Sequence, residues 1–316
     1  MQSQSGSDVQ RAARLLAAGD VVGVPTETVY GLAANAFDAA AVARVFEVKR
    51  RPSFDPLIVH VRTPEAVLQV ATHLPPAAER LAEVFWPGPL TLVLERCEHV
   101  PDLVTSGLPT VGVRCPRHPL IQELLEALEF PLAAPSANRF GSISPTTAEH
   151  VLDQLGGEVP YVLDGGACTV GVESTIVGFK GDRCLLYRPG GVPLEDLEAQ
   201  VGPLEDARQS APTSPITPGM LPSHYAPRTP LELGDLDELM ARYEGRRLGV
   251  LSFEREREAL CSRTLSTRGD LSEAAQRLFA ALRELDDSGA ELLVAEPVPE
   301  RGLGRAINDR LRRAAR

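Results

Sequence analysis

The chain has 316 residues, of which 43% are hydrophobic and 24% charged, and its formal net charge is −11. This composition is ordinary for a globular protein with a real core, and the length exceeds the roughly 100–200 residues of one domain, so two domains are expected. The negative charge argues against a stand-alone nucleic-acid binder, which needs a basic footprint, and neither half of the chain is basic.

The beginning of the chain carries no sign of export. It lacks the apolar core and cleavage site of a signal peptide, and no apolar run approaches the ~20 residues that a membrane span needs. The five cysteines are scattered and odd in number, with no CxxC pair. We therefore expect a reduced, cytoplasmic protein that does not associate with a membrane.

Short apolar runs alternate with amphipathic stretches between residues 20 and 201. Consecutive runs near residues 91–114 and 172–188 have no helix pattern between them, so a mixed sheet is expected rather than a purely parallel one. Ser144 followed by Pro145 predicts the start of a helix. The pattern predicts strands at 21–26, 56–61, 89–95, 109–115, 130–136, 160–166, 171–179 and 183–190, and helices at 39–48, 77–85, 120–128 and 145–155.

The composition changes after residue 201. Pro, Ser, Thr and Ala without periodicity indicate a linker, although its His224-Tyr225 pair is more than a spacer needs. Strands at 247–253 and 290–297 and helices at 271–285 and 303–315 follow, which predicts a small βαβα unit of doubly wound character. We expect one domain at 6–201, a linker at 202–229 and a second domain at 230–316.

Lys49 is unusual because the chain contains only two lysines against thirty arginines. It lies in the basic run Lys49-Arg50-Arg51-Pro52. A compact lysine charge beside the planar arginine fork suits a polyphosphate. A basic helix end that complements the helix dipole explains Lys49 equally well, so both interpretations stay open on this residue alone.

The common nucleotide signatures are absent. Neither lysine fits a P-loop, and no nucleophile elbow or zinc spacing occurs. Gly302-Leu303-Gly304 lacks the third glycine of a dinucleotide-binding motif and is interpreted as a helix-entry turn. Polar residues instead follow the strands, where open α/β sheets place ligands. Turn chemistry explains each of them alone, whereas together they suggest a ligand with phosphate, carboxylate and hydroxyl groups. They are Thr26, Glu27, Thr28, His60, Arg114, Ser136, Asn138, Ser174 and Arg188.

A series of motifs spread over nearly the whole chain resembles the YrdC family. The motifs are PTETVYGL, KRRP with PLIVH, WPGPLTLVL, VGVRCPRHP, APSAN with SPTTAEHV, GVESTIV and RPGG, and the PGM to HYAP linker with the C-terminal unit is similar to the long, two-domain threonylcarbamoyl-AMP synthases. The resemblance implies a twisted mixed α/β sheet with a positively charged cavity, followed by a small Rossmann-like domain. It implies synthesis of L-threonylcarbamoyladenylate from L-threonine, bicarbonate and ATP, with release of pyrophosphate. The product would feed threonylcarbamoylation of tRNA beside the anticodon by downstream machinery.

The resemblance also implies site residues. Lys49 and Arg51 would stabilise the charge on the phosphates. Mg²⁺ would arrive with ATP and would need no metal site in the protein. Asp55 stands where many members have asparagine, which puts its contact with ATP in doubt. ATP is expected to meet Lys49, Arg51, Asp55, Thr110, Ser136, Asn138, Ser144, Arg188 and Tyr225. L-Threonine is expected to meet Thr28, His60, Arg114, Ala134 and Ser174. The linker is hypothesised to close over the cavity as a lid.

Other functions remain open from the sequence. An RNA-binding module or a regulator that senses nucleotide or threonine could use the same cavity, and direct tRNA binding is undecided. A carbamoyl-transfer enzyme of hydrogenase maturation would carry zinc-finger cysteine pairs and an acylphosphatase domain, neither of which occurs in this sequence. The C-terminal unit shows no convincing site, so support of the linker, oligomerisation and ligand binding all stay open for it.

Overall fold

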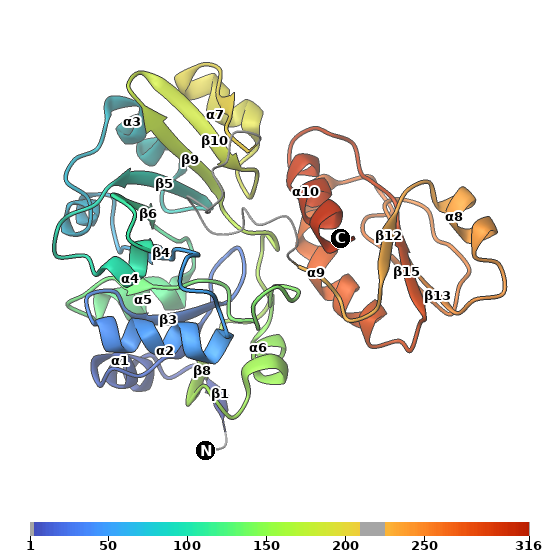
Figure 1. The fold of residues 1–316 in the computed structure, drawn as a ribbon, viewed down its shortest axis with the longest axis horizontal. Helices are drawn as coiled ribbons and strands as arrows, with labels where there is room; N and C mark the ends of the chain where they lie inside the picture. The colour runs from blue at the N-terminus through green and yellow to red at the C-terminus, as the bar shows by residue number, and fades with distance from the viewer. Residues whose placement is uncertain (1–2, 209–224, 316) are drawn as a thin grey trace.

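The N-terminal part of the chain is built on one large twisted sheet (Figure 1). The computed structural model describes residues 3–208 and 225–315. Within these residues, eleven strands follow the order β1-β8-β2-β3-β7-β4-β6-β5-β9-β10-β11. They are β1 (Gln4–Gly6), β2 (Val22–Val24), β3 (Gly31–Asn35), β4 (Ile58–His60), β5 (Leu90–Glu95), β6 (Thr110–Arg114), β7 (Leu132–Ala133), β8 (Tyr161–Leu163), β9 (Thr175–Lys180), β10 (Arg183–Arg188) and β11 (Glu205–Asp206).

The predicted mixed sheet is confirmed. β4 pairs with β6 and β5 with β9 in parallel, whereas β5 with β6 and β9 with β10 are antiparallel. All eight predicted strands of this part occur. The pattern missed β1, β3 and β11, because short strands rich in Gly, Ala and polar residues lack the β-branched signal on which the prediction depends.

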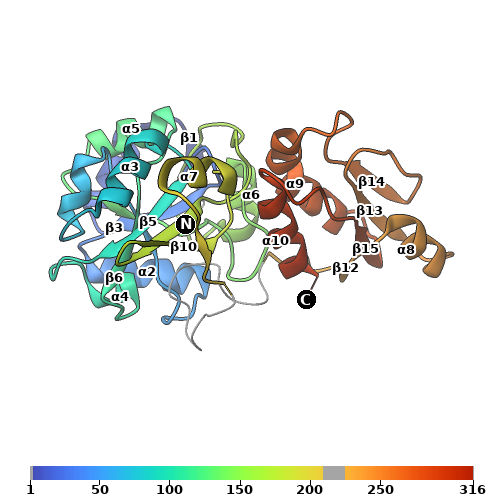
Figure 2. The same ribbon diagram turned by 90° about the horizontal axis from the view of Figure 1, so that it is seen from above.

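Helices cover both faces of this sheet (Figure 2), and the first two begin at capping aspartates. Asp8 and Asp38 cap the first two helices, each accepting from backbone N–H groups of the first turn. The helices are α1 (Val9–Ala17), α2 (Ala39–Lys49), α3 (Pro76–Phe85), α4 (Asp102–Thr105), α5 (Pro119–Glu126), α6 (Ala148–Leu155) and α7 (Leu194–Val201), with a 3₁₀ turn at Glu65–Gln69.

Two details of the helix prediction were wrong. The helix expected from Pro145 begins at Ala148, where the Thr147 hydroxyl accepts from the N–H of His150, because the Ser144 hydroxyl is engaged in a tertiary hydrogen bond with Glu173. In addition, α4 interrupts the stretch between β5 and β6 that was expected to be free of helix. Among the described residues, no helix is both long and apolar enough to cross a membrane.

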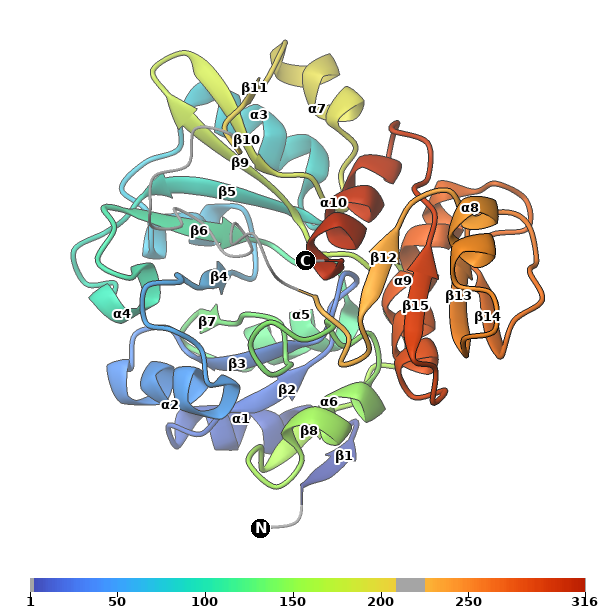
Figure 3. The same ribbon diagram turned by 45° about the vertical axis from the view of Figure 1, so that its right-hand side comes forward.

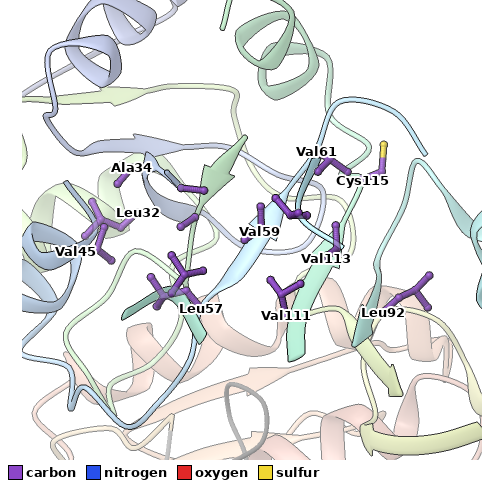
Figure 4. Close-up of a cluster of buried hydrophobic side chains, with 14 of the residues drawn as sticks. Leu32, Ala34, Val45, Leu57, Val59, Val61, Leu92, Val111, Val113 and Cys115 are labelled. Carbon is purple, nitrogen blue, oxygen red and sulfur yellow. The ribbon is translucent and has the colours of Figure 1, made fainter. Parts of the chain in front are cut away.

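The main core lies between this sheet and its helices (Figure 4). Figure 4 shows Val45 of α2 beside Leu32 and Ala34 of β3, with Leu57 and the side chains of β4, β6 and β5 continuing the cluster away from α2. Leu32, Val45, Val59 and Val113 have no exposed surface in this cluster. Burial of so many branched side chains fixes which ends of β4 and β6 lie together, and those ends carry His60 and Arg114.

The C-terminal unit is a second, parallel sheet of order β12-β15-β13-β14 within the described residues. Its elements are β12 (Leu231–Leu233), α8 (Leu236–Arg242), β13 (Leu248–Ser252), β14 (Cys261–Thr264), α9 (Leu271–Asp286), β15 (Leu292–Ala295) and α10 (Gly304–Ala314). The predicted β13, α9, β15 and α10 are confirmed, and Gly302-Leu303-Gly304 is the entry turn of α10 as expected. β12, α8 and β14 enlarge the unit beyond the predicted βαβα.

Helices α9 and α10 pack against the larger unit (Figures 1 and 3). One buried apolar cluster joins Val29, Ile143 and Val172 of the larger unit to residues of both helices. Gly171 lies so close to α9 that a Cβ on it would stand 2.3 Å from the Cα of Gln276. The guanidinium of Arg283 donates to the carbonyl of Ile143 at the same junction.

We expect Gly171→Ala to destabilise the junction. Gly171 has a φ of +79°, where an alanine costs about 1 kcal/mol, and its new methyl would also strike the backbone of α9. Gly166→Ala is the matched control, since Gly166 has a φ of +77° and open space around a Cβ. Urea unfolding should show a loss for Gly171→Ala that exceeds the control by at least ~1 kcal/mol. Equal losses would contradict the tight junction.

Candidate active site

A small cavity of about 50 Å³ lies where several strands of the large sheet end. Its walls come from the turn after β2, the ends of β4, β6 and β10, the segment after β7 and the segment before β9. Tyr225, from the segment that precedes the C-terminal unit, completes it. The lining residues are Thr26, Thr28, Val29, Gly31, Arg51, Ile58, His60, Arg114, Ala134, Pro135, Ser136, Glu173, Ser174, Arg188 and Tyr225.

Arg114 is the cation on one side of the cavity, and three different groups fix its guanidinium. The Nε donates to the carbonyl of Gly88 (3.2 Å), and Nη1 donates to the hydroxyl of Thr28 (2.8 Å). The Nη2 lies 2.7 Å from the Oε1 of Glu27, and both side chains are almost fully buried. A guanidinium held in this way is suited to a carboxylate ligand.

His60 lies opposite Arg114 in the register of β4 and β6. Burial, and then the neighbouring Arg114 charge, lower the pKa of His60 to about 3. The imidazole is therefore neutral near pH 7 and adds no second positive charge to this side of the cavity.

Arg51 faces the cavity because of how α2 ends. Arg50 adopts the left-handed conformation (φ 53°) after Lys49, and the N–H of Arg51 returns to the carbonyl of Phe46. The Arg51 side chain donates to the carbonyls of Asp55 (3.0 Å) and Pro56 (2.8 Å). The helix terminus thus turns this guanidinium inward.

Lys49 lies one layer behind the cavity and does not line it. Its Nζ donates to the backbone carbonyls of Ser136 and of Asn138 (2.6 Å to the latter), and the side chain is 1% exposed. Burial, followed by the charge of Arg51, lowers the pKa of Lys49 well below its usual value, while Asp55 opposes that effect. In this arrangement Lys49 holds the segment that carries Ser136.

Asp55 pairs with Arg51 instead of facing the cavity. Its Oδ2 lies 2.8 Å from the Nη2 of Arg51, and the residue has no exposed surface. Burial raises the pKa of Asp55, and the charges of Arg51, Lys49 and Arg188 lower it in part. An anion at this position offsets positive charge beside the cavity.

A chain of contacts links the cavity to the C-terminal unit through Glu173. One oxygen of Glu173 accepts from the Ser144 hydroxyl (2.6 Å) and the other from the Nε of Arg310 on α10 (2.7 Å). Arg310 has no exposed surface, and its Nη1 also donates to the carbonyl of Pro189 (3.1 Å). Burial raises the pKa of Glu173, but Arg310, Arg188 and Ser144 outweigh it and bring the pKa to about 2.

Ser174 and Tyr225 close the cavity on this side. Arg188 donates to the carbonyl of Ser174 (3.0 Å) and to its hydroxyl (3.2 Å). Tyr225 is 1% exposed and has a left-handed φ of 66°. Its ring stacks on Phe279 of α9, with 5.6 Å between the ring centroids, and the Cζ of Arg310 lies 5.2 Å from the centroid of the Tyr225 ring. The C-terminal unit therefore supports the wall that Tyr225 forms.

Comparison with known families identifies the chain. A family described as "Telomere recombination" matches residues 14–190, and one described as "Threonylcarbamoyl-AMP synthase, C-terminal domain" matches residues 192–316. The chain belongs to the threonylcarbamoyl-AMP synthase family. Threonylcarbamoyl-AMP synthase of Pyrococcus abyssi is 41% identical over 97% of this chain and 94% of its own, and that of Bacillus subtilis is 39% identical over 99% and 94%.

Solved structures extend the likeness to the fold. The crystal structure of P. abyssi Sua5 complexed with L-threonine covers 99% of this chain and 97% of its own, with 40% identity and a TM-score of 0.92. The family's two-domain form, with a large mixed sheet and a small parallel one, is therefore shown for this chain.

The structure brings most of the predicted site residues to the cavity. Nine line it, namely Thr28, Arg51, His60, Arg114, Ala134, Ser136, Ser174, Arg188 and Tyr225. Asn138 and Ser144 stand behind its wall with Lys49 and Asp55, and Thr110 begins β6, at the far end from Arg114. Contacts with nucleotide and threonine stay predictions for all of them. Residues 209–224 of the predicted linker lie outside the described residues, so its lid role stays a prediction as well.

Sequence reasoning missed two residues that matter to the geometry. Glu173 directly precedes Ser174, and its sequence signal, an acidic residue in a strand-end loop, is weak. Arg310 begins the arginine-rich run at 310–313, and basic residues are typical of helix ends. Its burial against Glu173, 137 residues away in the chain, depends on the docking of the two units.

A larger cleft of about 530 Å³ lies between α6 and the end of α9. Its walls carry both signs of charge, and the carboxylate of Asp286 already pairs with Arg228 (3.0 Å) and accepts from the N–H of Thr229 (2.8 Å). The smaller cavity is the better candidate, because its polar groups come from strand ends and converge on one space.

We expect Glu173→Gln to weaken the fold in a pH-dependent way. The pKa of Glu173 falls from 4.5 to about 2 on folding, so the ionised carboxylate contributes stability that is complete above pH 4.5 and lost as the pH falls toward 2. Urea unfolding should show a deficit of about 3 kcal/mol for the variant at pH 7 that shrinks below pH 4. A loss of unfolding free energy that stays the same at every pH would contradict the role of the ionised carboxylate. Glu95→Gln is the control, because the Glu95 side chain is 62% exposed.

Proposed function

We propose that the chain joins L-threonine, bicarbonate and ATP into L-threonylcarbamoyladenylate and releases pyrophosphate. The likeness to threonylcarbamoyl-AMP synthases over nearly the full length supports this reaction. The observation that carries it is the cavity itself, where a clamp suited to a carboxylate and two further arginines suited to phosphates face one space.

Threonine is proposed to bind on the Arg114 side. Its carboxylate would meet the guanidinium, while the Thr28 and Ser174 hydroxyls and the backbone at Ala134 would hold its polar groups. His60, which is neutral near pH 7, would line the pocket without competing for the carboxylate. The triphosphate is proposed to bind near Arg51, Ser136 and Arg188, with Tyr225 beside it.

The chemistry requires no nucleophile from the protein. The threonine amine attacks the carbon of bicarbonate to give a carbamate and water, and a carbamate oxygen then attacks the α-phosphorus of ATP. The bond from the α-phosphorus to the bridging oxygen breaks, and pyrophosphate leaves with the electron pair. The protein contributes by holding labile partners together and by stabilising the charge that develops on the phosphates.

Magnesium is proposed to enter as part of the nucleotide substrate. Within residues 3–208 and 225–315, no group of three or more His, Cys, Asp and Glu side chains could hold a metal ion. The acidic groups closest to the cavity, Glu27, Asp55 and Glu173, each pair with an arginine. Phosphate oxygens and water are accordingly the ligands expected for Mg²⁺.

The cavity must widen to admit ATP. Its volume of about 50 Å³ is far below the roughly 300–1,000 Å³ of typical ligand pockets.

Cytoplasmic location and delivery of the adenylate to the machinery that modifies tRNA belong to the same proposal, because a mixed anhydride is labile in water and must be consumed near its source.

Pyrophosphate release tests the proposed function. Release from Mg·ATP should require both L-threonine and bicarbonate. Arg51→Ala should lower kcat/KM at least ~100-fold, since it removes a cation from the phosphate side. Lys49→Ala should reduce turnover with little effect on L-threonine affinity. Lys49 holds the segment that carries Ser136, which is proposed to meet the triphosphate, and it does not contact Arg114.

Other outcomes would point elsewhere. Hydrolysis of ATP that ignores threonine, or threonine and ATP binding without pyrophosphate release, would overturn the synthase and favour a sensor. RNA binding that weakens steeply with salt and needs no ATP would favour an RNA-binding module.

A further inference from the structure

Glu27 is a buried carboxylate beside the cavity that the proposed reaction does not use. It is 1% exposed and does not line the cavity, although Thr26 and Thr28 on either side of it do. Its backbone carbonyl accepts from the N–H of Val170 (2.7 Å), which ties the turn after β2 to the segment before β9. The side chain therefore points away from the ligand space, behind the groups that face it.

Each oxygen of Glu27 lies beside a different positively polarised group. Oε1 lies 2.7 Å from the Nη2 of Arg114, and Oε2 accepts from the backbone N–H of Arg117 (3.0 Å). Only a carboxylate offers two acceptors at these two places. A glutamine would set its amide N–H₂ against one of the two donors, whichever way the amide turned.

The opposite side of the guanidinium is fixed by hydroxyl groups of defined polarity. Thr26 donates its hydroxyl proton to the carbonyl of Val29 (2.6 Å), so in the 2.8 Å contact between the two threonine hydroxyls Thr28 must be the donor. The Thr28 oxygen then accepts from the Nη1 of Arg114. With the Nε on Gly88, every nitrogen of the guanidinium has a defined neighbour.

The contact between Glu27 and Arg114 is close but not aligned. Among the described residues, neither Oε1 of Glu27 nor Nη2 of Arg114 has a hydrogen bond of good geometry, although the atoms are 2.7 Å apart. The charges compensate each other while the N–H groups of Nη2 are not directed at Glu27. Those N–H groups stay available for a ligand carboxylate from the cavity.

We propose that Glu27 is a positioning residue that orients Arg114 for the carboxylate of the amino-acid substrate. The inference rests on the proposed function, because that function makes Arg114 the carboxylate clamp. Loss of the negative charge 2.7 Å from Nη2 removes the fixed counter-charge and lets the guanidinium turn. Selection of a carboxylate then weakens while the phosphate side of the cavity, built on other arginines, is unaffected.

The test compares Glu27→Gln with wild type for two ligands that differ only at the recognised group. L-Threonine carries the carboxylate, and L-threoninol carries a hydroxymethyl group in its place. Calorimetric titration should show L-threonine affinity falling at least ~10-fold in the variant, with L-threoninol affinity changing less than ~2-fold, so the preference for the acid collapses. The KM for L-threonine should rise equally in pyrophosphate release, while the KM for ATP stays within ~2-fold.

Asp286→Asn is the matched control. Like Glu27, Asp286 accepts from backbone N–H groups, here those of Arg228 and Thr229, and pairs with an arginine, but it lies in the cleft at the end of α9. It should lose stability without a change in the preference for threonine over threoninol. If Glu27→Gln does not fold, Glu27→Asp, which keeps the charge one methylene further from Arg114, should show the same selective loss to a smaller extent.

A double variant separates positioning from general structure. Arg114→Lys should remove most of the preference for the acid, and adding Glu27→Gln to it should cost little more, because the two residues act as one unit. Folded Glu27 variants that keep the wild-type preference, or that lose affinity for threonine, threoninol and ATP alike, would overturn the inference. Failure of wild type to bind L-threonine would overturn the proposed function itself and this inference with it.

Discussion

The cations around the cavity can be buried because carboxylates and carbonyls of the protein itself already pair with them, without a ligand. An uncompensated charge in a low-dielectric interior costs several kcal/mol, so a site that must attract anions needs internal partners for its own cations. Carboxylates compensate Arg51, Arg114 and Arg310, and backbone carbonyls hold Lys49 and Arg188. Each partner also fixes an orientation, so the groups that compensate charge are the groups that shape the site.

This requirement explains how the two units depend on each other. Glu173 lines the cavity, yet its counter-charge, Arg310, comes from the C-terminal unit. The same arginine lies over the Tyr225 ring, and α9 supplies Phe279 beneath it. A separated N-terminal unit would leave Glu173 buried without its main partner and Tyr225 without its stack. We infer that the C-terminal unit acts on the site by completing its electrostatics and its wall.

The sequence predicted the parts of this arrangement that local pattern encodes. Short apolar runs indicated the central strands, and polar residues at strand ends indicated most of the side chains that line the cavity. The rarity of lysine singled out Lys49 as a candidate phosphate contact, but it could not show that the amine donates to the carbonyls of Ser136 and Asn138. Ser144-Pro145 carried a helix-start signal that a tertiary hydrogen bond to Glu173 overrode. Arg310 has no local signal, and Glu27 was marked only as one of the polar residues that follow strands, because the contacts of both arise only when distant segments meet.

The pairing of charges also accounts for the selectivity the site can have. Arg114 already carries a carboxylate partner, so the cavity offers directed N–H groups there in place of a bare positive charge. Arg51 and Arg188 are the other guanidinium groups that line the cavity, and the Asp55 carboxylate reduces but does not cancel the positive charge of Lys49, Arg51 and Arg188 together. A ligand with one carboxylate and several phosphate charges fits such a division, because hydrogen-bond direction selects the first and accumulated charge selects the second. The acidic chain as a whole therefore holds an anion site that depends on local arrangement and not on net charge.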